Sequence, residues 1–210
     1  MNNILKESKY SVNKAVQFLK TNKLVSLKTE TVYGLACDPS SIISIKKLYD
    51  IKDRPFVNPL IIHISSVNML KSICNTNELT EKIINHFWPG PLTIILPRKE
   101  NKNILDFAVS GLNTIAVRMP KSKVFLKVLE KFGKPIAAPS ANKSGYISST
   151  KASHVYDSFE KKIDLIIDSG QSDFGLESTI IDLSSDKIIL RRPGVIDTEV
   201  IETVIEKKIY

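Results

Sequence analysis

The chain has 210 residues, a mass of 23.5 kDa and a formal net charge of +8 at pH 7. Its hydrophobic content of 42% and charged content of 25% are ordinary for a folded globular protein, so the composition excludes a disordered or fibrous architecture. Domains commonly have about 100 to 200 residues, and we therefore predict one domain over residues 1–210.

The positive charge favours encounters with polyanions such as nucleotides or nucleic acid. Lysines are scattered along the chain, however, and isolated lysines also suit an ordinary solvated surface. Arginine is much rarer, and its guanidinium pairs with carboxylate or phosphate in a two-point fashion that lysine cannot imitate. The five arginines are Arg54, Arg98, Arg118, Arg191 and Arg192.

The two cysteines, Cys37 and Cys74, have no paired spacing that would indicate zinc binding or a redox dithiol. We predict that both are reduced thiols. The N-terminus lacks a signal-peptide core, and no stretch approaches the roughly 18 apolar residues of a membrane span. These features predict a cytoplasmic protein that does not cross a membrane, and no metal-binding cluster is evident.

Apolar residues at helical spacing alternate with β-rich runs along the chain. The sequence predicts helices after caps at Ser11, Ser40 and Asp197, one that Thr80 opens, and another over 124–132 that Gly133 ends. Strands are predicted over 24–27, 60–64, 92–96, 114–117, 135–138, 163–167, 179–183 and 187–190, with a polar loop from 28 to 34. This order predicts an α/β fold in which helices flank one twisted mixed sheet.

Polar strings follow several of these strands, where ligands commonly bind in open α/β sheets. They contain cations and neutral hydrogen-bonding groups rather than an obvious nucleophile, which suits the holding of an anion. Other interpretations stay open. Lys52 and Arg54 could simply meet a helix C-terminus, Thr29 and Thr31 could cap a turn, and His63 could be a core residue.

The sequence lacks the Gly-x-Ser-x-Gly elbow of serine hydrolases, the Walker P-loop and the Rossmann glycine fingerprint. Six strings in order nevertheless resemble the YrdC-type threonylcarbamoyl-adenylate synthases, over nearly the whole chain. The strings are Thr29-Glu30-Thr31-Val32-Tyr33-Gly34-Leu35, Lys52-x-Arg54 with Asn58-Pro59-Leu60, Trp88-Pro89-Gly90-Pro91-Leu92-Thr93, Pro139-Ser140-Ala141-Asn142, Gly175-x-Glu177-Ser178-Thr179 and Arg192-Pro193-Gly194.

This resemblance implies a concave basic cavity that takes ATP with Mg²⁺, L-threonine and bicarbonate. The implied products are pyrophosphate and threonylcarbamoyl-AMP, which a tRNA-modifying threonylcarbamoyl transferase complex would use. The implied catalytic residues are Lys52, Arg54, Ser140 and Asn142. ATP would contact Arg54, Asn58, Thr114, Ser140, Ser148 and Arg192, while threonine would contact Thr31, His63, Arg118, the backbone at Ala138, and Ser178.

The chain departs from the family pattern at Lys28, Ser122 and Ser149. It also ends soon after the Arg192 turn and a helix, so we expect the extra C-terminal domain of longer family members to be absent. Two other hypotheses remain: a basic RNA-binding module, or a simple ATP-hydrolysing protein. A weak contact with RNA would also be compatible with a synthase.

Overall fold

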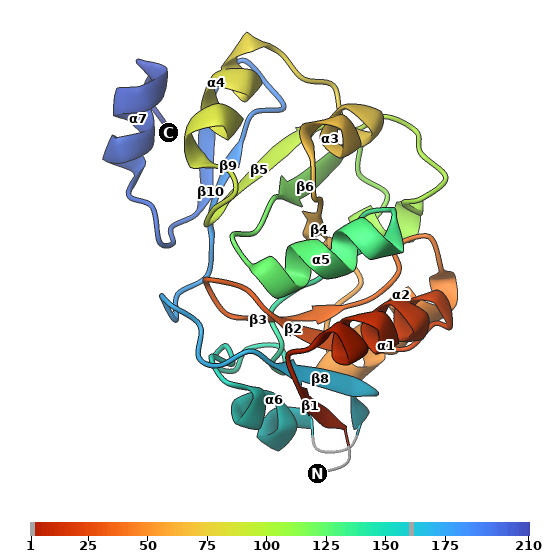
Figure 1. Cartoon of the computed structure of the whole chain (residues 1–210). Coiled ribbons are helices and arrows are strands. Elements are labelled where there is room, and N and C mark those ends of the chain that lie inside the picture. The colour runs from red at the N-terminus through yellow and green to blue at the C-terminus, as the bar shows by residue number, and fades with distance from the viewer. Residues whose placement is uncertain (1–2, 160–161) are drawn as a thin grey trace.

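The computed structural model describes residues 3–159 and 162–210 (Figure 1). Its strands are β1 Ile4–Lys6, β2 Val25–Lys28, β3 Tyr33–Ala36, β4 Ile62–His63, β5 Leu92–Pro97, β6 Thr114–Arg118, β7 Ile136–Ala137, β8 Leu165–Asp168, β9 Thr179–Asp182 and β10 Ile189–Arg192. Its α-helices are α1 Lys9–Lys20, α2 Ile42–Lys52, α3 Val67–Ile73, α4 Glu78–Phe87, α5 Lys123–Phe132, α6 Ala152–Phe159 and α7 Thr198–Ile205. A short 3₁₀ helix, η1, spans Asp106–Val109.

The strands form two mixed sheets, which confirms the predicted α/β class but corrects the prediction of one sheet. The smaller sheet has the order β1-β8-β2-β3, and the larger has the order β10-β9-β5-β6-β4-β7. Parallel pairs such as β2 with β8 and β5 with β9 occur beside antiparallel pairs such as β5 with β6. The alternation of helices and strands predicted the class, but it did not determine how many sheets the strands form.

The two sheets meet edge to edge along a seam between β3 and β7. The amide of Cys37 donates to the carbonyl of Ala137 at 2.9 Å, and the amide of Ala137 donates back to Cys37 at 3.1 Å. The amide of Leu35 donates to the carbonyl of Pro139 at 2.8 Å. Backbone hydrogen bonds therefore connect the segment after β7 to the smaller sheet.

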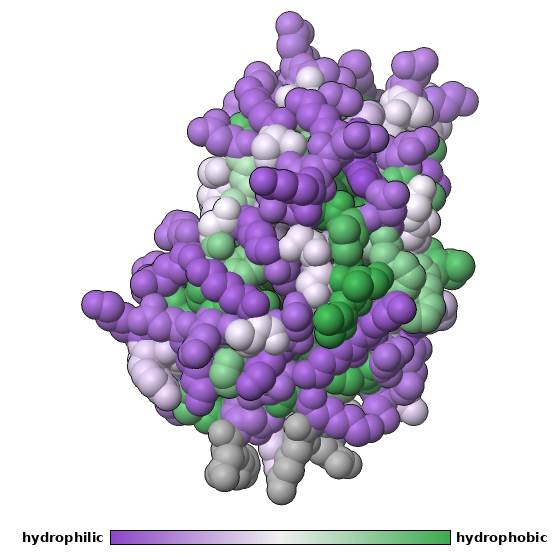
Figure 2. All heavy atoms as spheres, turned by 90° about the vertical axis from the view of Figure 1, so that its right-hand side faces the viewer, coloured by the Kyte–Doolittle hydropathy of each residue, from purple (hydrophilic) through white to green (hydrophobic). Residues whose placement is uncertain are grey.

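Two groups of buried hydrophobic residues stabilise this arrangement. The larger group lies mainly around the six-stranded sheet and α2 to α4, and the smaller group fills the space between α1, α5 and the smaller sheet. Helices α1 and α5 pack against each other on one side of the molecule (Figure 1). Figure 2 shows that hydrophilic residues cover most of the face it views, with hydrophobic residues gathered near its middle.

Three predicted helix starts were wrong by one to three positions. Helix α1 begins at Lys9, because the Ser8 hydroxyl accepts from the Ser11 amide while the Ser11 hydroxyl accepts from the Ser8 amide. Ser11 is thus the second member of a capping box. In the same way Thr80 is the second member of a capping box whose first member is Asn77, and Ser41 rather than Ser40 caps α2.

Other elements agree with the prediction in place but differ in extent. Strands over 60–64 and 135–138 shorten to Ile62–His63 and Ile136–Ala137, and Gly133 ends α5 in the left-handed conformation, as predicted. The predicted loop from 28 to 34 is wrong in part, because it contains the start of β3. The sequence prediction missed β1, α3 and α6. Within the described residues, no helix is both long enough and apolar enough to cross a membrane.

Candidate functional site

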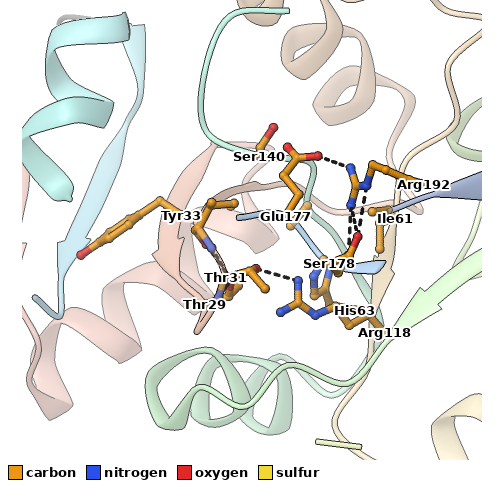
Figure 3. Close-up of a pocket in the computed structure, with 13 residues that line it drawn as sticks. Thr29, Thr31, Tyr33, Ile61, His63, Arg118, Ser140, Glu177, Ser178 and Arg192 are labelled. Carbon is orange, nitrogen blue, oxygen red and sulfur yellow. Dashed lines mark hydrogen bonds and ion pairs between the residues drawn. The ribbon is translucent and has the colours of Figure 1, made fainter. Parts of the chain in front are cut away.

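A pocket lies beside the seam between the two sheets (Figure 3). The turn between β2 and β3, the ends of β4 and β6, the segment after β7, the start of β9 and the end of β10 supply its walls. The lining residues are Thr29, Thr31, Val32, Tyr33, Gly34, Ile61, His63, Arg118, Ala138, Ser140, Glu177, Ser178 and Arg192.

The turn between β2 and β3 is fixed by the hydroxyl of Thr29. This oxygen accepts hydrogen bonds from the amides of Thr31 and Val32, both at 3.2 Å, and lies 2.6 Å from the carbonyl oxygen of Val32. The turn-capping interpretation of Thr29 is therefore confirmed. Thr31 differs from it, because its hydroxyl accepts from a guanidinium in the pocket wall.

That guanidinium belongs to Arg118, at the end of β6, and three groups of the chain accept hydrogen bonds from it. Its Nη2 contacts a carboxylate oxygen of Glu30 at 2.7 Å, Nη1 donates to the Thr31 hydroxyl at 2.9 Å, and Nε donates to the Gly90 carbonyl at 3.1 Å. Burial lowers the pKa of Arg118, whereas the Glu30 charge acts in the opposite direction. The second Glu30 oxygen accepts from the Lys121 amide at 3.0 Å. Arg118 is therefore a buried cation with a fixed orientation.

His63, on β4, is also buried. Its ring stacks on Phe125 with 4.9 Å between ring centroids, and its Nδ1 has no hydrogen-bond partner among the described residues. Burial, and next the charge of Arg118, lower the pKa of His63 to about 3. The imidazole is therefore neutral at physiological pH and can donate or accept a hydrogen bond at the pocket wall.

Arg192 and Glu177 form an ion pair on another side of the pocket (Figure 3). Arg192 Nη1 donates to Glu177 Oε2, while Nε and Nη2 donate to the carbonyl of Ser178 at 3.1 and 2.9 Å. The Ser148 hydroxyl donates to Glu177 Oε1 at 3.0 Å. Burial alone would raise the pKa of the Glu177 carboxyl, but the Arg192 charge and hydrogen bonds from Ser140, Ser148 and Arg192 lower it.

Lys52 supports the segment that follows β7. Its ammonium donates to the carbonyl of Ser140 at 2.6 Å and to the carbonyl of Asn142, and its own carbonyl accepts from the Ser144 amide at 2.9 Å. Burial, and next the charge of Arg54, lower the pKa of Lys52 to about 7. Lys52 is 1% exposed and does not line the pocket.

Arg54 and Asn142 mainly order their own loops. Arg54 donates to the carbonyls of Asn58 and Pro59 at 3.2 and 2.9 Å, so the helix-dipole interpretation does not describe its contacts. The Asn142 amide group donates to the carbonyls of Lys143 and Tyr146 at 2.9 and 2.7 Å.

The structure therefore divides the predicted site residues into two sets, whose roles stay predictions. All five proposed threonine contacts line the pocket, together with two proposed ATP contacts: Thr31, His63, Arg118, Ala138, Ser178, Ser140 and Arg192. The remaining residues lie outside its lining: Lys52, Arg54, Asn58, Thr114, Asn142 and Ser148. Of these, Lys52 and Ser148 contact lining residues directly, whereas Thr114 lies at the opposite end of β6 from Arg118.

Glu177 lines the pocket but was not among the residues predicted to bind a ligand. It belongs to one of the six strings, and the available signal was an acidic residue among groups expected to hold anions.

The three departures from the family pattern have structural contacts. Lys28 pairs with Asp173 at 3.2 Å, Ser122 caps α5, and the Ser149 hydroxyl donates to the carbonyl of Ala141 at 2.7 Å.

Comparisons with known proteins support the family resemblance that the six sequence motifs indicate. Residues 17–194 match the Sua5/YciO/YrdC family, whose description is "Telomere recombination". The chain is 44% identical over 197 residues to the threonylcarbamoyl-AMP synthase of Pyrococcus abyssi, covering 93% of this chain and 57% of that protein. It is 40% identical over 195 residues to the Bacillus subtilis protein of the same name, covering 92% and 56% of the two chains.

A solved structure gives the same result for the fold. The crystal structure of Pyrococcus abyssi Sua5 complexed with L-threonine superimposes with a TM-score of 0.92 at 42% identity, over 99% of this chain and 61% of that chain. This chain thus spans little more than half the length of these relatives. The family match over 178 residues, the shared fold and the ordered strings lead to one conclusion: the chain belongs to the Sua5/YciO/YrdC family.

Proposed function

We propose that the protein is an L-threonylcarbamoyladenylate synthase, a nucleotidyltransferase that forms threonylcarbamoyl-AMP and pyrophosphate from L-threonine, bicarbonate and ATP. The observation that carries the proposal is the convergence of seven predicted ligand contacts on one pocket containing two arginines. Relatives named as this enzyme add support, because they are about 40% identical over nearly all of this chain.

Arg118 is the proposed partner of the threonine carboxylate. Three of its five N–H groups are used within the chain, so two remain for a two-point contact with a carboxylate. The neutral, unpartnered His63 beside it would meet a polar group of the same amino acid, together with Ser178 and the backbone at Ala138. This end of the pocket has the chemistry to hold an amino acid by its carboxylate.

Arg192 and Ser140, with Ser148 next to them, would bind the phosphates of ATP. Arg54, Asn58 and Thr114 are proposed to complete the nucleotide contacts outside the lining of the pocket.

The proposed reaction requires no nucleophile from the protein. The threonine amine and carbon dioxide derived from bicarbonate form a carbamate, whose oxygen attacks the α-phosphorus while pyrophosphate leaves. Such displacements depend mainly on positioning and on neutralisation of charge. The fixed guanidinium groups and the loop that Lys52 holds would supply both.

Mg²⁺ would accompany ATP rather than occupy a resident site. The described residues contain no group of three or more His, Cys, Asp or Glu side chains arranged to hold a metal ion. Mg²⁺ commonly binds to substrate phosphates with few protein ligands, and this donor set suits that mode. When bound, the ion would neutralise phosphate charge.

We further propose one catalytic domain over residues 1–210. The partly buried Leu126 packs against both hydrophobic groups, which supports a continuous interior. The product would pass to a tRNA-modifying transferase complex in the cytoplasm, with at most weak contact between this protein and RNA.

The test is pyrophosphate release from ATP, measured with threonine and bicarbonate present together and with each omitted. The proposal expects release only when both are present. Equal release without threonine would instead identify a simple ATP-hydrolysing protein. Tight RNA binding that weakens steeply with salt, without threonine-dependent use of ATP, would identify the RNA-binding alternative.

A further inference from the structure

We propose that Glu177 is an internal competitor for the phosphate-binding groups of the pocket: its carboxylate must release Arg192 and Ser148 before nucleotide phosphates can use them. The proposed function gives Glu177 no role. This inference rests on the proposed function only for the identity of the anion, which is a nucleotide phosphate.

Arg192 has too few free N–H groups to bind phosphate at two points while it also binds Glu177. A guanidinium has five, and four of them are used within the chain. Nε donates to the Ser178 carbonyl, Nη2 donates to the carbonyl and to the hydroxyl of Ser178, and Nη1 donates to Glu177. One N–H remains, whereas two-point binding of phosphate needs two. Release of Glu177 would supply the second from Nη1.

Ser148, which was also expected to contact ATP, faces the same carboxylate. A serine hydroxyl has one proton to donate, and the shorter contact of the Ser148 hydroxyl is to Glu177 Oε1 at 3.0 Å, against 3.5 Å to Asn142 Oδ1. Ser140, a further predicted phosphate contact, lies beside the same carboxylate (Figure 3). Side chains expected to bind phosphate thus surround one acidic group of the protein itself.

The pKa of Glu177 is lowered despite its partial burial, so the side chain is an anion near neutral pH. A phosphate oxygen at Arg192 would lie close to this carboxylate, and two anions at one guanidinium repel each other. Exchange is therefore favoured over joint occupation.

The backbone around Glu177 limits how the exchange can occur. The Glu177 carbonyl accepts from the Val195 amide at 3.2 Å, and the amides of Gly175 and Thr179 donate to Thr31 and Pro91 at 3.0 and 3.1 Å. These contacts fix the chain on both sides of Glu177. Release then requires a rotation of the side chain rather than movement of the loop.

A competing carboxylate would affect product release as well as binding. After the displacement step, pyrophosphate would hold Arg192 and Ser148, and the returning Glu177 would take them back. The carboxylate thereby weakens the binding of ATP and helps pyrophosphate to leave. Its removal is expected to lower both KM for ATP and kcat.

The experiment is calorimetric titration with inorganic pyrophosphate, which needs neither threonine nor turnover. Glu177→Gln should bind pyrophosphate about tenfold more tightly than the unmodified protein, the scale expected for one charge-assisted hydrogen bond. The matched control is Asp173→Asn, which removes the same charge from an exposed carboxylate outside the pocket lining and should leave the affinity nearly unchanged. Unchanged or weaker binding by Glu177→Gln would overturn the proposal.

A double-mutant cycle separates exchange at Arg192 from a general effect of charge. If Glu177 competes for Arg192, then Glu177→Gln should gain little pyrophosphate affinity when Arg192→Ala is also present. An equal gain in both backgrounds would contradict the competition.

A crystal structure of the unmodified protein with pyrophosphate keeps the test independent of variant folding. The expected result is a Glu177 carboxylate beyond hydrogen-bond distance of Arg192, and an intact ion pair beside bound pyrophosphate would contradict the proposal.

The competition at Arg192 and the synthase activity can also fail separately. Exchange without threonine-dependent product would sustain the competition and reject the synthase, whereas synthesis with an intact ion pair would do the reverse.

Discussion

The ammonium of Lys52 donates a hydrogen bond to the backbone carbonyl of Ser140, with 2.6 Å between Nζ and O. This contact joins the end of α2 to a segment 88 residues later in the chain. Because Lys52 also binds the Asn142 carbonyl, one buried cation holds both ends of Ser140-Ala141-Asn142. Lys52 therefore positions the Ser140 segment from outside the lining of the pocket.

This burial predicts a pH dependence of stability. The folded pKa of Lys52 is about 7, below its ordinary value of 10.5, so between these values the unfolded chain binds a proton that the folded chain has released. The free energy of unfolding contributed by this group should thus rise between about pH 7 and pH 10.5, and should not change below pH 7, where both states are protonated. Denaturant unfolding at pH 7 and 9 should show a smaller rise for Lys52→Met.

The control for that experiment is Lys20→Met, which replaces an exposed lysine in the last turn of α1. Its pH dependence should match that of the unmodified protein. An identical rise in Lys52→Met would show that Lys52 does not release its proton on folding.

The buried pair of Arg118 and Glu30 predicts a large loss of stability when one partner is neutralised. Glu30→Gln would leave the guanidinium without its counter-charge, and such changes cost about 3 to 5 kcal/mol. Urea unfolding measures the loss. The control Glu81→Gln breaks an exposed pair with Lys71 and should change stability by less than about 1 kcal/mol. Similar small losses in both variants would be incompatible with a critical buried pair.

His63 predicts sensitivity to acid. Its folded pKa of about 3 lies below the ordinary value of 6.5, so the unfolded chain takes up a proton first as pH falls. The contribution of His63 to the free energy of unfolding should therefore decrease from about pH 6.5 to 3. Unfolding of the unmodified protein and of His63→Gln at pH 6.5 and 4.5 measures this decrease. Imidazole NMR that shows a charged His63 at pH 5 would contradict it.

Arg54 predicts a change in nucleotide use. It braces the loop at Asn58 and Pro59 and is a proposed ATP contact, so Arg54→Ala should weaken transition-state binding by about 1 to 3 kcal/mol. The measurement is kcat/KM for ATP at saturating threonine and bicarbonate. Arg98→Ala, which removes a pair with the exposed Asp106, is the control and should retain near-normal kcat/KM. Equal values for the two variants would remove Arg54 from the site.

The sequence predicted the α/β class and most elements, because apolar periodicity and turn residues act locally. It failed where residue type alone does not show which groups pair with each other. The start of β3 was taken for a loop, although Tyr33 and Gly34 pair with Lys28 and Leu27 of β2. Ser11 was taken for a cap, because a capping box offers two hydroxyls and only the backbone conformation shows which comes first.

The same distinction applies to the site. Short sequence motifs identified many of the residues that line the pocket. A motif cannot show, however, which of its polar groups already have hydrogen-bond partners within the chain. Lys52 and Arg54 are predicted to face the nucleotide, and only the folded chain shows that both also donate hydrogen bonds to backbone carbonyls. The ion pair of Glu177 with Arg192 joins two separate strings and could be recognised only from the folded chain.

The seam between β3 and β7 also bears on how the protein avoids self-association. Each of these strands covers the other's edge, so in the described part of the chain the outer strands of the two sheets are β1 and β10. Strand β1 has three residues and ends in Lys6, and the backbone of Tyr210 already bonds to Ile188 and Leu190 beside β10. Short, charged or covered edges resist the addition of a strand from another molecule. The junction that shapes the pocket thus also removes two surfaces on which intermolecular β-pairing could begin.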